Sequence, residues 1–433
     1  MKVFFLSLGC DKNRVDSEKM LGMLGASGFS FCDDEHEADV IVINTCCFID
    51  SAKEESIDAI LEMAKMKDDG VCKRLVVTGC MAERYKTEIL KELPEVDAIV
   101  GINELADVIK ASDPDHVTDE KNKIPDYKRI ITTPGHFEYI KIADGCDKRC
   151  TYCAIPNIRG HYKSIAYEEV LKDAENMAAA GVKELILVAQ ETTLYGTDLY
   201  HENRLPSLLH ELCKIEGINW IRLMYAYPED VDEKLLRTIS EEKKIVHYLD
   251  IPVQHSSDKI LKRMGRRTSR AELEKKIELI RTIIPDITLR TTLITGFPGE
   301  TCKDHDDVID FIKKIRFDHL GVFKYSREDG TPAAAFSNQV SERVKDRRYD
   351  DIMKVQNVIS HEKLKEKIGK VFDIMVEGYL PEDDIYVGRT YMDAPDIDGF
   401  FYIASGRELM TGDIITAKCT DASDYDLYGE IIE

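Results

Sequence analysis

Residues 145–153 of this chain read Gly145-Cys146-Asp147-Lys148-Arg149-Cys150-Thr151-Tyr152-Cys153 and bring three cysteines together. This stretch directly follows an apolar, β-branched run at residues 139–142, which is predicted to be a strand. Further runs of this kind alternate with long amphipathic helices such as 167–180 and 270–283. The six predicted strands are 139–142, 185–189, 221–225, 248–251, 287–294 and 321–324. Six βα units predict a partial TIM-like barrel, (β/α)6, which is open where the last strands of a complete barrel would lie.

The three cysteines of this stretch have the spacing CxxxCxxC, in a loop at the carboxyl end of the first barrel strand. Barrels of this kind place their chemistry at that end. Three thiolates ligate three irons of a four-iron cube, so the fourth iron keeps an open position. An open iron can chelate a small molecule and pass one electron to a neighbouring sulfonium bond. The spacing therefore predicts a radical S-adenosylmethionine (SAM) enzyme with a [4Fe-4S] cluster on Cys146, Cys150 and Cys153.

Two other interpretations of the triplet remain open. A structural zinc site needs four ligands, and the nearest further candidate, His161, lies beyond Pro156 and Gly160. The cysteines would otherwise be unliganded core residues. Tyr152 is predicted either to present its ring to the adenine of SAM or to pack at the barrel mouth.

Residues 1–114 are predicted to form a separate α/β domain. Strand-like runs at 3–8, 40–43, 75–77 and 98–100 alternate with helical patterns at 16–24, 51–65 and 83–91. This alternation predicts a doubly wound parallel sheet. The polar segment 115–131 is predicted to be a linker, and the barrel domain to occupy 132–364.

The remaining residues, 367–433, follow a charged helix predicted over 341–367. Short strands alternate there with turns rich in Pro, Gly and Asp, which predicts a small all-β, OB-like barrel.

Three further cysteines each follow a predicted strand of the N-terminal domain. Cys10, Cys46 and Cys80 come after the first, second and third of these strands. The carboxyl ends of parallel strands share one edge of a doubly wound sheet, so the three thiols are expected to converge and to hold a second cluster. The alternative is that each is buried as a small hydrophobic residue. Cys47 should point away from Cys46, and the other cysteines, Cys32, Cys72, Cys213, Cys302 and Cys419, are predicted to be structural.

Polar residues also follow the barrel strands or, at Arg290 and Thr292, lie on one of them. Gln190, Gln254 and Arg290, together with Tyr152, are predicted to contact SAM. Glu191, His255 and Thr292 occupy comparable positions, and the Gly-bearing turn at 295–300 would let the backbone approach adenosine. Helix-capping or solvated-loop roles are equally compatible with each of these residues.

Composition limits the functional classes. Of 433 residues, 12 are cysteine, too few for a disulfide scaffold, and their clustering favours metal binding in a reducing, cytoplasmic setting. A net charge of −22 disfavours a phosphate backbone and favours a basic partner. The start MKVFFLSLGC looks like a lipidation site, but its apolar run is shorter than the roughly seven residues that a signal peptide needs. No apolar run is long enough to span a membrane.

The motifs together resemble the radical SAM methylthiotransferase family over nearly the full chain. The resemblance rests on residues 7–18 (SLGCDKNRVDSE), Asn44-Thr45-Cys46, Thr78-Gly79-Cys80 and the Cys146 motif. Within the family, residues 9–13 (GCDKN) and 48–55 (FIDSAKEE) resemble the RimO branch more than the tRNA-modifying MiaB branch. Cys47 stands where the RimO pattern usually has glycine, so the ligand is Cys46 or Cys47, with Cys46 favoured.

The resemblance implies a cluster-binding N-terminal domain, a radical SAM barrel and a C-terminal TRAM domain. It also implies two [4Fe-4S] clusters, and SAM both as methyl donor and as radical source. The implied reaction adds a methylthio group to the β-carbon of an aspartate in small-subunit ribosomal protein number twelve. It would need a reductant such as flavodoxin or ferredoxin and a source of sulfur.

Charge gives an independent indication of the substrate. Residues 368–433 contain four basic residues against fifteen acidic ones. An RNA-binding barrel should be basic, whereas an acidic one suits a basic ribosomal protein or serves solubility alone. Two other functions remain as alternatives: a tRNA adenosine methylthiotransferase, and a non-catalytic iron–sulfur scaffold.

Overall fold

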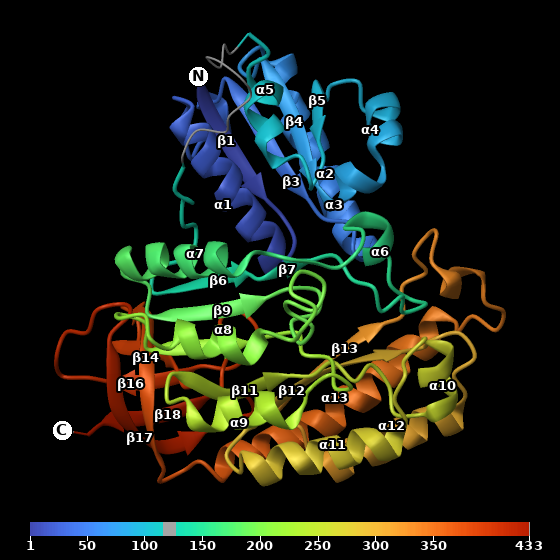
Figure 1. Cartoon of the computed structure of the whole chain (residues 1–433), viewed down its shortest axis with the longest axis vertical. Coiled ribbons are helices and arrows are strands. Elements are labelled where there is room, and N and C mark those ends of the chain that lie inside the picture. Colours follow the sequence, from blue (N-terminus) through green and yellow to red (C-terminus); the bar gives the residue numbers. More distant parts are fainter. Residues whose placement is uncertain (116–126, 433) are drawn as a thin grey trace.

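The computed structural model describes residues 1–115 and 127–432, in which an α/β unit, a larger α/β unit and a small β-barrel lie next to one another (Figure 1). Most of the segment expected to be a linker, residues 116–126, lies outside the described residues. The predicted fold class is confirmed in all three units. None of the described helices combines the length and the apolar character that crossing a bilayer requires.

The N-terminal unit is a parallel five-stranded sheet with the order β2-β1-β3-β4-β5. Its strands are β1 (Lys2–Ser7), β2 (Ser30–Phe31), β3 (Val40–Thr45), β4 (Arg74–Gly79) and β5 (Ala98–Val100). Its helices are α1 (Asp11–Ala26), α2 (Asp50–Asp68), α3 (Cys80–Arg84), α4 (Lys86–Glu92) and α5 (Val108–Ser112). All six residues of β3 are buried, because this central strand carries a hydrophobic cluster on each face.

The central unit is an open, parallel, six-stranded sheet with the order β6-β9-β10-β11-β12-β13. The strands are β6 (Phe137–Lys141), β9 (Glu184–Val188), β10 (Trp220–Leu223), β11 (Ile245–Asp250), β12 (Thr288–Thr295) and β13 (His319–Lys324). The helices are α6 (Ile155–Ile158), α7 (Tyr167–Ala179), α8 (Leu205–Leu212), α9 (Glu233–Glu241), α10 (Asp258–Arg263), α11 (Arg270–Ile283) and α12 (Cys302–Ile315). A short ribbon of β7 (Ala143–Asp144) and β8 (Lys163–Ser164) flanks the cysteine loop.

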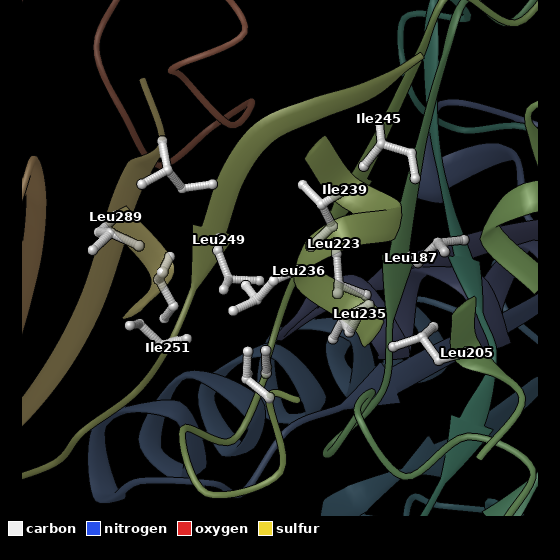
Figure 2. Close-up of a cluster of buried hydrophobic side chains, with 14 of the residues drawn as sticks. Leu187, Leu205, Leu223, Leu235, Leu236, Ile239, Ile245, Leu249, Ile251 and Leu289 are labelled. Carbon is white, nitrogen blue, oxygen red and sulfur yellow. The ribbon is translucent and has the colours of Figure 1, made fainter. Parts of the chain in front are cut away.

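The main core lies between this sheet and its outer helices. Leu187, Leu223 and Leu249 project from successive strands towards Leu236 and Ile239 of α9 (Figure 2). Alternate strand residues, among them Ile186, Met224 and Tyr248, face the inner side of the sheet and form a separate cluster. The period-2 alternation of the strands thus separates a structural face from an inner face that is free to carry chemistry.

The C-terminal unit is a closed barrel with the order β14-β15-β16-β18-β17. Its strands are β14 (Val371–Leu380), β15 (Ile385–Arg389), β16 (Phe401–Ala404), β17 (Ile414–Ala422) and β18 (Leu427–Ile431), and the long helix α13 (Glu342–Lys365) leads into them. Arg389 of this barrel and Arg222 of β10 both bind Glu184 of β9, at 2.8 and 2.7 Å. This fully buried ion triad fastens the barrel to the inner face of the central sheet.

Candidate functional site

The loop that carries the cysteine triplet is held by backbone contacts to two other segments. Gly145 has a φ of +72°, and a β-carbon there would lie 2.2 Å from the carbonyl oxygen of His161, so only glycine fits. The amide of Cys146 donates to Gly160 at 3.2 Å, and the amide of Thr151 donates to Met264 at 2.9 Å. The loop is therefore fixed in place by its surroundings.

The thiols of the triplet lie close enough to influence one another. Cys146 and Cys150 are buried and Cys153 is half-buried. Burial, together with the neighbouring Cys150, raises the pKa of Cys146 to about 11 and that of Cys153 to about 12. Buried thiols lose their protons only when a cation compensates for the thiolate charge. The donor set therefore fits a metal centre.

The number of thiols matches a cluster better than a structural zinc ion. A closed zinc site needs four ligands, whereas each cysteine set supplies three thiols. A four-iron cube accepts three thiolates because each binds a different iron and the fourth iron stays open.

Aromatic and charged groups surround the central triplet. The hydroxyl of Tyr227 lies 3.2 Å from the sulfur of Cys150, and the guanidinium of Arg266 stacks 4.2 Å from the centre of the Tyr227 ring. Lys148 forms an ion pair with Asp230 and lies 4.0 Å from Glu191. A cavity of about 80 Å³ opens beside Cys150 between these residues.

Tyr152 lies at the edge of a hydrophobic cluster. It is half-buried and packs against the group Ile260, Met264, Phe297, Tyr325 and Ala333. Burial raises its pKa well above the usual range, and Cys150 adds to this effect. Tyr152, within the cysteine loop, thus has a packing role at the barrel mouth.

The predicted SAM-contacting residues have different surroundings. Within the described residues, the side-chain oxygens of Gln190 and Gln254 are buried and have no hydrogen-bond partner. Such groups are rarely left unpaired, so both are available to a polar ligand. Arg290 instead binds Asp250 at 3.2 Å and Asp398 of the C-terminal barrel at 3.6 Å. Its guanidinium thus has an ion-pairing role on the inner face.

The other strand-end residues have mainly structural surroundings. His255 is buried, its Nδ1 accepts from the amide of Ser257 at 2.9 Å, and burial lowers its pKa to about 3. Glu300 accepts from the amide of Phe297 at 3.0 Å and binds Arg348 at 3.1 Å, which fixes the Gly-bearing turn. Glu191 is buried, and burial raises its pKa to about 7.

The N-terminal cysteines meet at the carboxyl edge of their sheet. Cys10 precedes α1, Cys46 follows β3 and Cys80 begins α3, and the strands before them are neighbours in the order β1-β3-β4. Gly9 has a φ of +89°, and a β-carbon there would lie 2.8 Å from that of Cys46. Glycine therefore lets the segment before Cys10 reach Cys46. Cys47 is fully buried in the core cluster on one face of the sheet.

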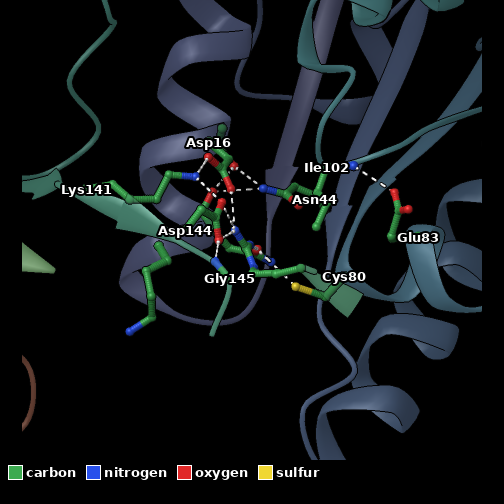
Figure 3. A network of polar contacts seen from close by, with 12 residues as sticks. Asp16, Asn44, Cys80, Glu83, Ile102, Lys141, Asp144 and Gly145 are labelled. Atoms are coloured by element: carbon green, nitrogen blue, oxygen red, sulfur yellow. Dashed lines mark hydrogen bonds and ion pairs between the residues drawn. The ribbon is translucent and has the colours of Figure 1, made fainter. Parts of the chain in front are cut away.

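A polar network joins this cysteine edge to the central unit (Figure 3). Arg159, which follows α6, binds Asp16 of α1 at 3.1 Å and Asp144 at 2.8 Å, and donates to Asn13 at 2.7 Å. Burial raises the pKa of Cys80 to about 12, against the opposing effect of Arg159. The two cysteine sets thus face one shared interdomain region, and α3 contacts α6 across it.

Sequence reasoning did not identify Asn13 or Arg159. Asn13 lies one helical turn after Cys10, and this spacing could have marked it as a neighbour of the thiols. Arg159 lies 146 residues from Asn13, and no local pattern links the two.

Lys12 was also missed, although it belongs to the GCDKN motif. Its ammonium lies 3.3 Å from the centre of the Tyr225 ring and 2.9 Å from the carboxylate of Asp11. Tyr225 follows β10 in the left-handed region, with a φ of +58°. The first turn of α1 therefore reaches the inner face of the central sheet.

Comparison with known families matches the three units separately. Residues 2–101 match the Uncharacterized protein family UPF0004, residues 140–312 the Radical SAM superfamily and residues 368–432 the TRAM domain. The cysteine loop thus lies in a radical SAM domain, and the closed barrel is a TRAM domain.

Solved structures share the fold at low sequence identity. The radical SAM methyltransferase TsrM from Kitasatospora setae matches with a TM-score of 0.56 and 15% identity, over 77% of this chain and 76% of that one. The cobalamin-dependent radical SAM enzyme OxsB matches with a TM-score of 0.52 and 15% identity, over 82% of this chain and 56% of that one. These matches support the arrangement of the central unit.

Curated relatives match the chain from end to end. A ribosomal protein uS12 methylthiotransferase RimO from Lachnoclostridium phytofermentans is 51% identical over 437 residues, which covers 99% of each chain. The protein of the same name from Clostridioides difficile is 45% identical over 445 residues, covering 100% of this chain and 99% of the relative. These relatives match all three domains of the chain at 45–51% identity. The chain therefore belongs to the RimO family of ribosomal protein uS12 methylthiotransferases.

Proposed function

We propose that this chain adds a methylthio group to the β-carbon of an aspartate side chain in ribosomal protein uS12. The observation that carries the proposal is the full-length identity to RimO enzymes, at 51% over 437 residues. The meeting of two cysteine sets at one domain boundary adds support, because the reaction needs both a radical and a sulfur atom at one place.

In this proposal Cys146, Cys150 and Cys153 hold one [4Fe-4S] cluster with an open iron. When bound, this cluster and SAM supply a carbon radical, which can remove hydrogen from a carbon that acid–base chemistry cannot activate. Burial of Cys146 and Cys150 shields their sulfurs from water, and Gln190 and Gln254 offer unpaired oxygens to a polar ligand. Tyr227 and Arg266 close one side of this site.

Cys10, Cys46 and Cys80 hold a second [4Fe-4S] cluster in the same proposal, with SAM also acting as methyl donor to sulfur. The three residues come from adjacent strand ends, and glycines at positions 9 and 79 let the backbone segments approach one another. We assign the ligand to Cys46 rather than Cys47, because Cys46 lies against the segment before Cys10: a β-carbon at Gly9 would be 3.1 Å from the sulfur of Cys46.

The proposed partner is uS12, a basic ribosomal protein. The TRAM domain carries fifteen acidic and four basic residues between positions 368 and 433, which suits a basic protein and disfavours RNA. A ribosomal substrate sets the reaction in the cytoplasm. A reductant such as flavodoxin or ferredoxin would supply electrons, and a separate donor would supply sulfur.

The radical step is tested by the formation of deoxyadenosine from SAM under reducing, oxygen-free conditions. The reconstituted chain should form deoxyadenosine, and C146A/C150A/C153A should form none. The matched control C32A/C213A/C302A removes three cysteines outside both sets and should retain the reaction. Equal deoxyadenosine formation by the first variant and the parent would overturn the assignment, and its absence from the parent would indicate a cluster scaffold.

A further inference from the structure

We propose that Arg159 is a positioning residue for the N-terminal cysteine set, holding Asn13 in place and presenting a positive charge to the cluster on Cys10, Cys46 and Cys80. This inference rests on the second cluster of the proposed function. It assigns to a residue of the radical SAM domain the task of tuning a cofactor bound by the neighbouring domain.

Asn13 is the first element of the argument, because its side chain contacts the backbone next to two of the cysteines. Its amide nitrogen donates to the carbonyl of Leu8 at 3.2 Å and to that of Thr45 at 2.9 Å. Its oxygen lies 3.6 Å from the sulfur of Cys80. One buried side chain thus connects the segments before Cys10 and Cys46 and faces Cys80.

Arg159 fixes the orientation of this amide. One of its terminal nitrogens, Nη2, donates to the oxygen of Asn13 at 2.7 Å, and the other, Nη1, binds the carboxylates of Asp16 and Asp144. The Arg159 side chain is 1% exposed, so water does not replace these contacts. Because the guanidinium only donates, the amide oxygen of Asn13 must face it and the amide nitrogen must face Leu8 and Thr45.

In this network, the side of the Arg159 guanidinium that faces the cysteines carries no carboxylate. Lys141 binds both Asp16 and Asp144, so two cations balance two carboxylates (Figure 3). The carboxylates lie on the Nη1 side of Arg159, whereas its Nη2 side faces Asn13 and Cys80. The four side chains together are neutral, but the cluster would face the positively charged Nη2 side of Arg159.

The expected consequence is electrostatic. A four-iron cube on three thiolates is anionic and gains further negative charge on reduction, so a nearby buried cation favours the reduced form. The same network extends to the central triplet, because Asp144 accepts from the amide of Gly145 at 2.9 Å, next to Cys146. Arg159 therefore connects Asn13, next to the N-terminal cysteines, with Asp144, next to the central triplet.

The test uses the full chain with C146A/C150A/C153A, so that the remaining iron belongs to the N-terminal set. Into this background are placed R159Q, R159K and the control R129Q. Arg129 is equally buried at the same domain boundary but binds Glu18, Glu138 and Asp173 instead. Iron per chain and the midpoint potential of the cluster, from a redox titration followed by electron paramagnetic resonance, are measured for each.

We expect R159Q to lower the midpoint potential, so that the ratio of reduced to oxidised cluster at a fixed potential falls roughly tenfold, equivalent to about 59 mV. R159K should shift it less because the charge remains, and R129Q should match the parent. If R159Q cannot hold the cluster, retention of iron by both R159K and R129Q supports the same role.

Two results would overturn the inference: an R159Q midpoint equal to that of the parent, or the same iron loss in R129Q as in R159Q. Absence of iron from the C146A/C150A/C153A parent would instead remove the second cluster, and with it that part of the proposed function. The two failures are therefore distinguishable.

Discussion

The ammonium of Lys12 lies 3.3 Å from the centre of the Tyr225 ring, which joins the first turn of α1 to the inner face of the central sheet. The hydroxyl of Tyr225 also donates to Asp11 at 3.3 Å. Lys12 is buried, and it directly follows the pair Cys10-Asp11. Lys12 is therefore a buried cation near Cys10 in the chain, held by the carboxylate of Asp11 and the ring of Tyr225. We predict that the aspartate carboxylate of uS12 contacts it.

K12M should weaken the binding of uS12 without changing the iron content of the protein. A charge-assisted contact to a carboxylate contributes roughly 1.5–3 kcal/mol, so the KM for uS12 should rise at least about tenfold. Steady-state kinetics and iron analysis check this, with K91M as the control because Lys91 is largely exposed. An unchanged KM in K12M would exclude a role for Lys12 in substrate binding.

Cys46 and Cys47 should respond differently to replacement by alanine. C46A should lose about four of the roughly eight irons expected for two cubes. C47A should keep all of them, because Cys47 is not a ligand in this assignment and its loss costs packing and the contact with Arg84. Iron analysis after anaerobic reconstitution measures the difference. The reverse pattern, with iron lost from C47A and kept in C46A, would assign the ligand to Cys47.

His255 should make the central domain sensitive to acid. Its pKa is lowered by burial to about 3 in the fold, against about 6.5 in the unfolded chain. Below pH 6.5 the unfolded chain binds a proton that the fold excludes, so stability falls as the pH drops. The loss from this group between pH 7.5 and 5.5 is about 1.4 kcal/mol.

The single tryptophan, Trp220 on β10, provides a fluorescence signal for this domain in urea titrations. H255Q should show a smaller loss of unfolding free energy between the two pH values than the parent. H361Q serves as the control, since His361 is half-buried on α13. Equal losses in H255Q and the parent would contradict the prediction.

The acidic TRAM surface should contribute to uS12 binding. Glu382, Asp383 and Asp384 are exposed in the loop between β14 and β15. E382Q/D383N/D384N should weaken binding roughly threefold to tenfold at low salt and reduce its salt dependence. The control E278Q/D306N/D310N removes three exposed acids from α11 and α12. Equal weakening in both variants would mean that only total charge matters.

The parts of the site that depend on local pattern were predictable from sequence. Cys10, Cys46 and Cys80 follow runs that form parallel strands, and parallel topology brings their carboxyl ends to one edge. The contact between Arg159 and Asn13 was not predictable, because it depends on how two domains dock. The ion pair of Arg290 with Asp398 was not predictable for the same reason, because Asp398 belongs to the TRAM domain.

Short elements were the weak point of the fold prediction. Strand β2, Ser30–Phe31, is only two residues long and carries no periodic signal. The helix expected over 83–91 is two helices, α3 and α4, because Tyr85 leaves the helical conformation with φ −123° and ψ 30°.

The central claim is that the substrate is a protein, and the product of the complete reaction tests it most directly. The reduced, reconstituted chain is incubated with SAM and a sulfur source, together with uS12 or with tRNA, and both products are analysed by mass spectrometry. We predict one methylthio group on an aspartate of uS12, absent with C146A/C150A/C153A, and unmodified tRNA. A methylthio group found only on tRNA would contradict the account.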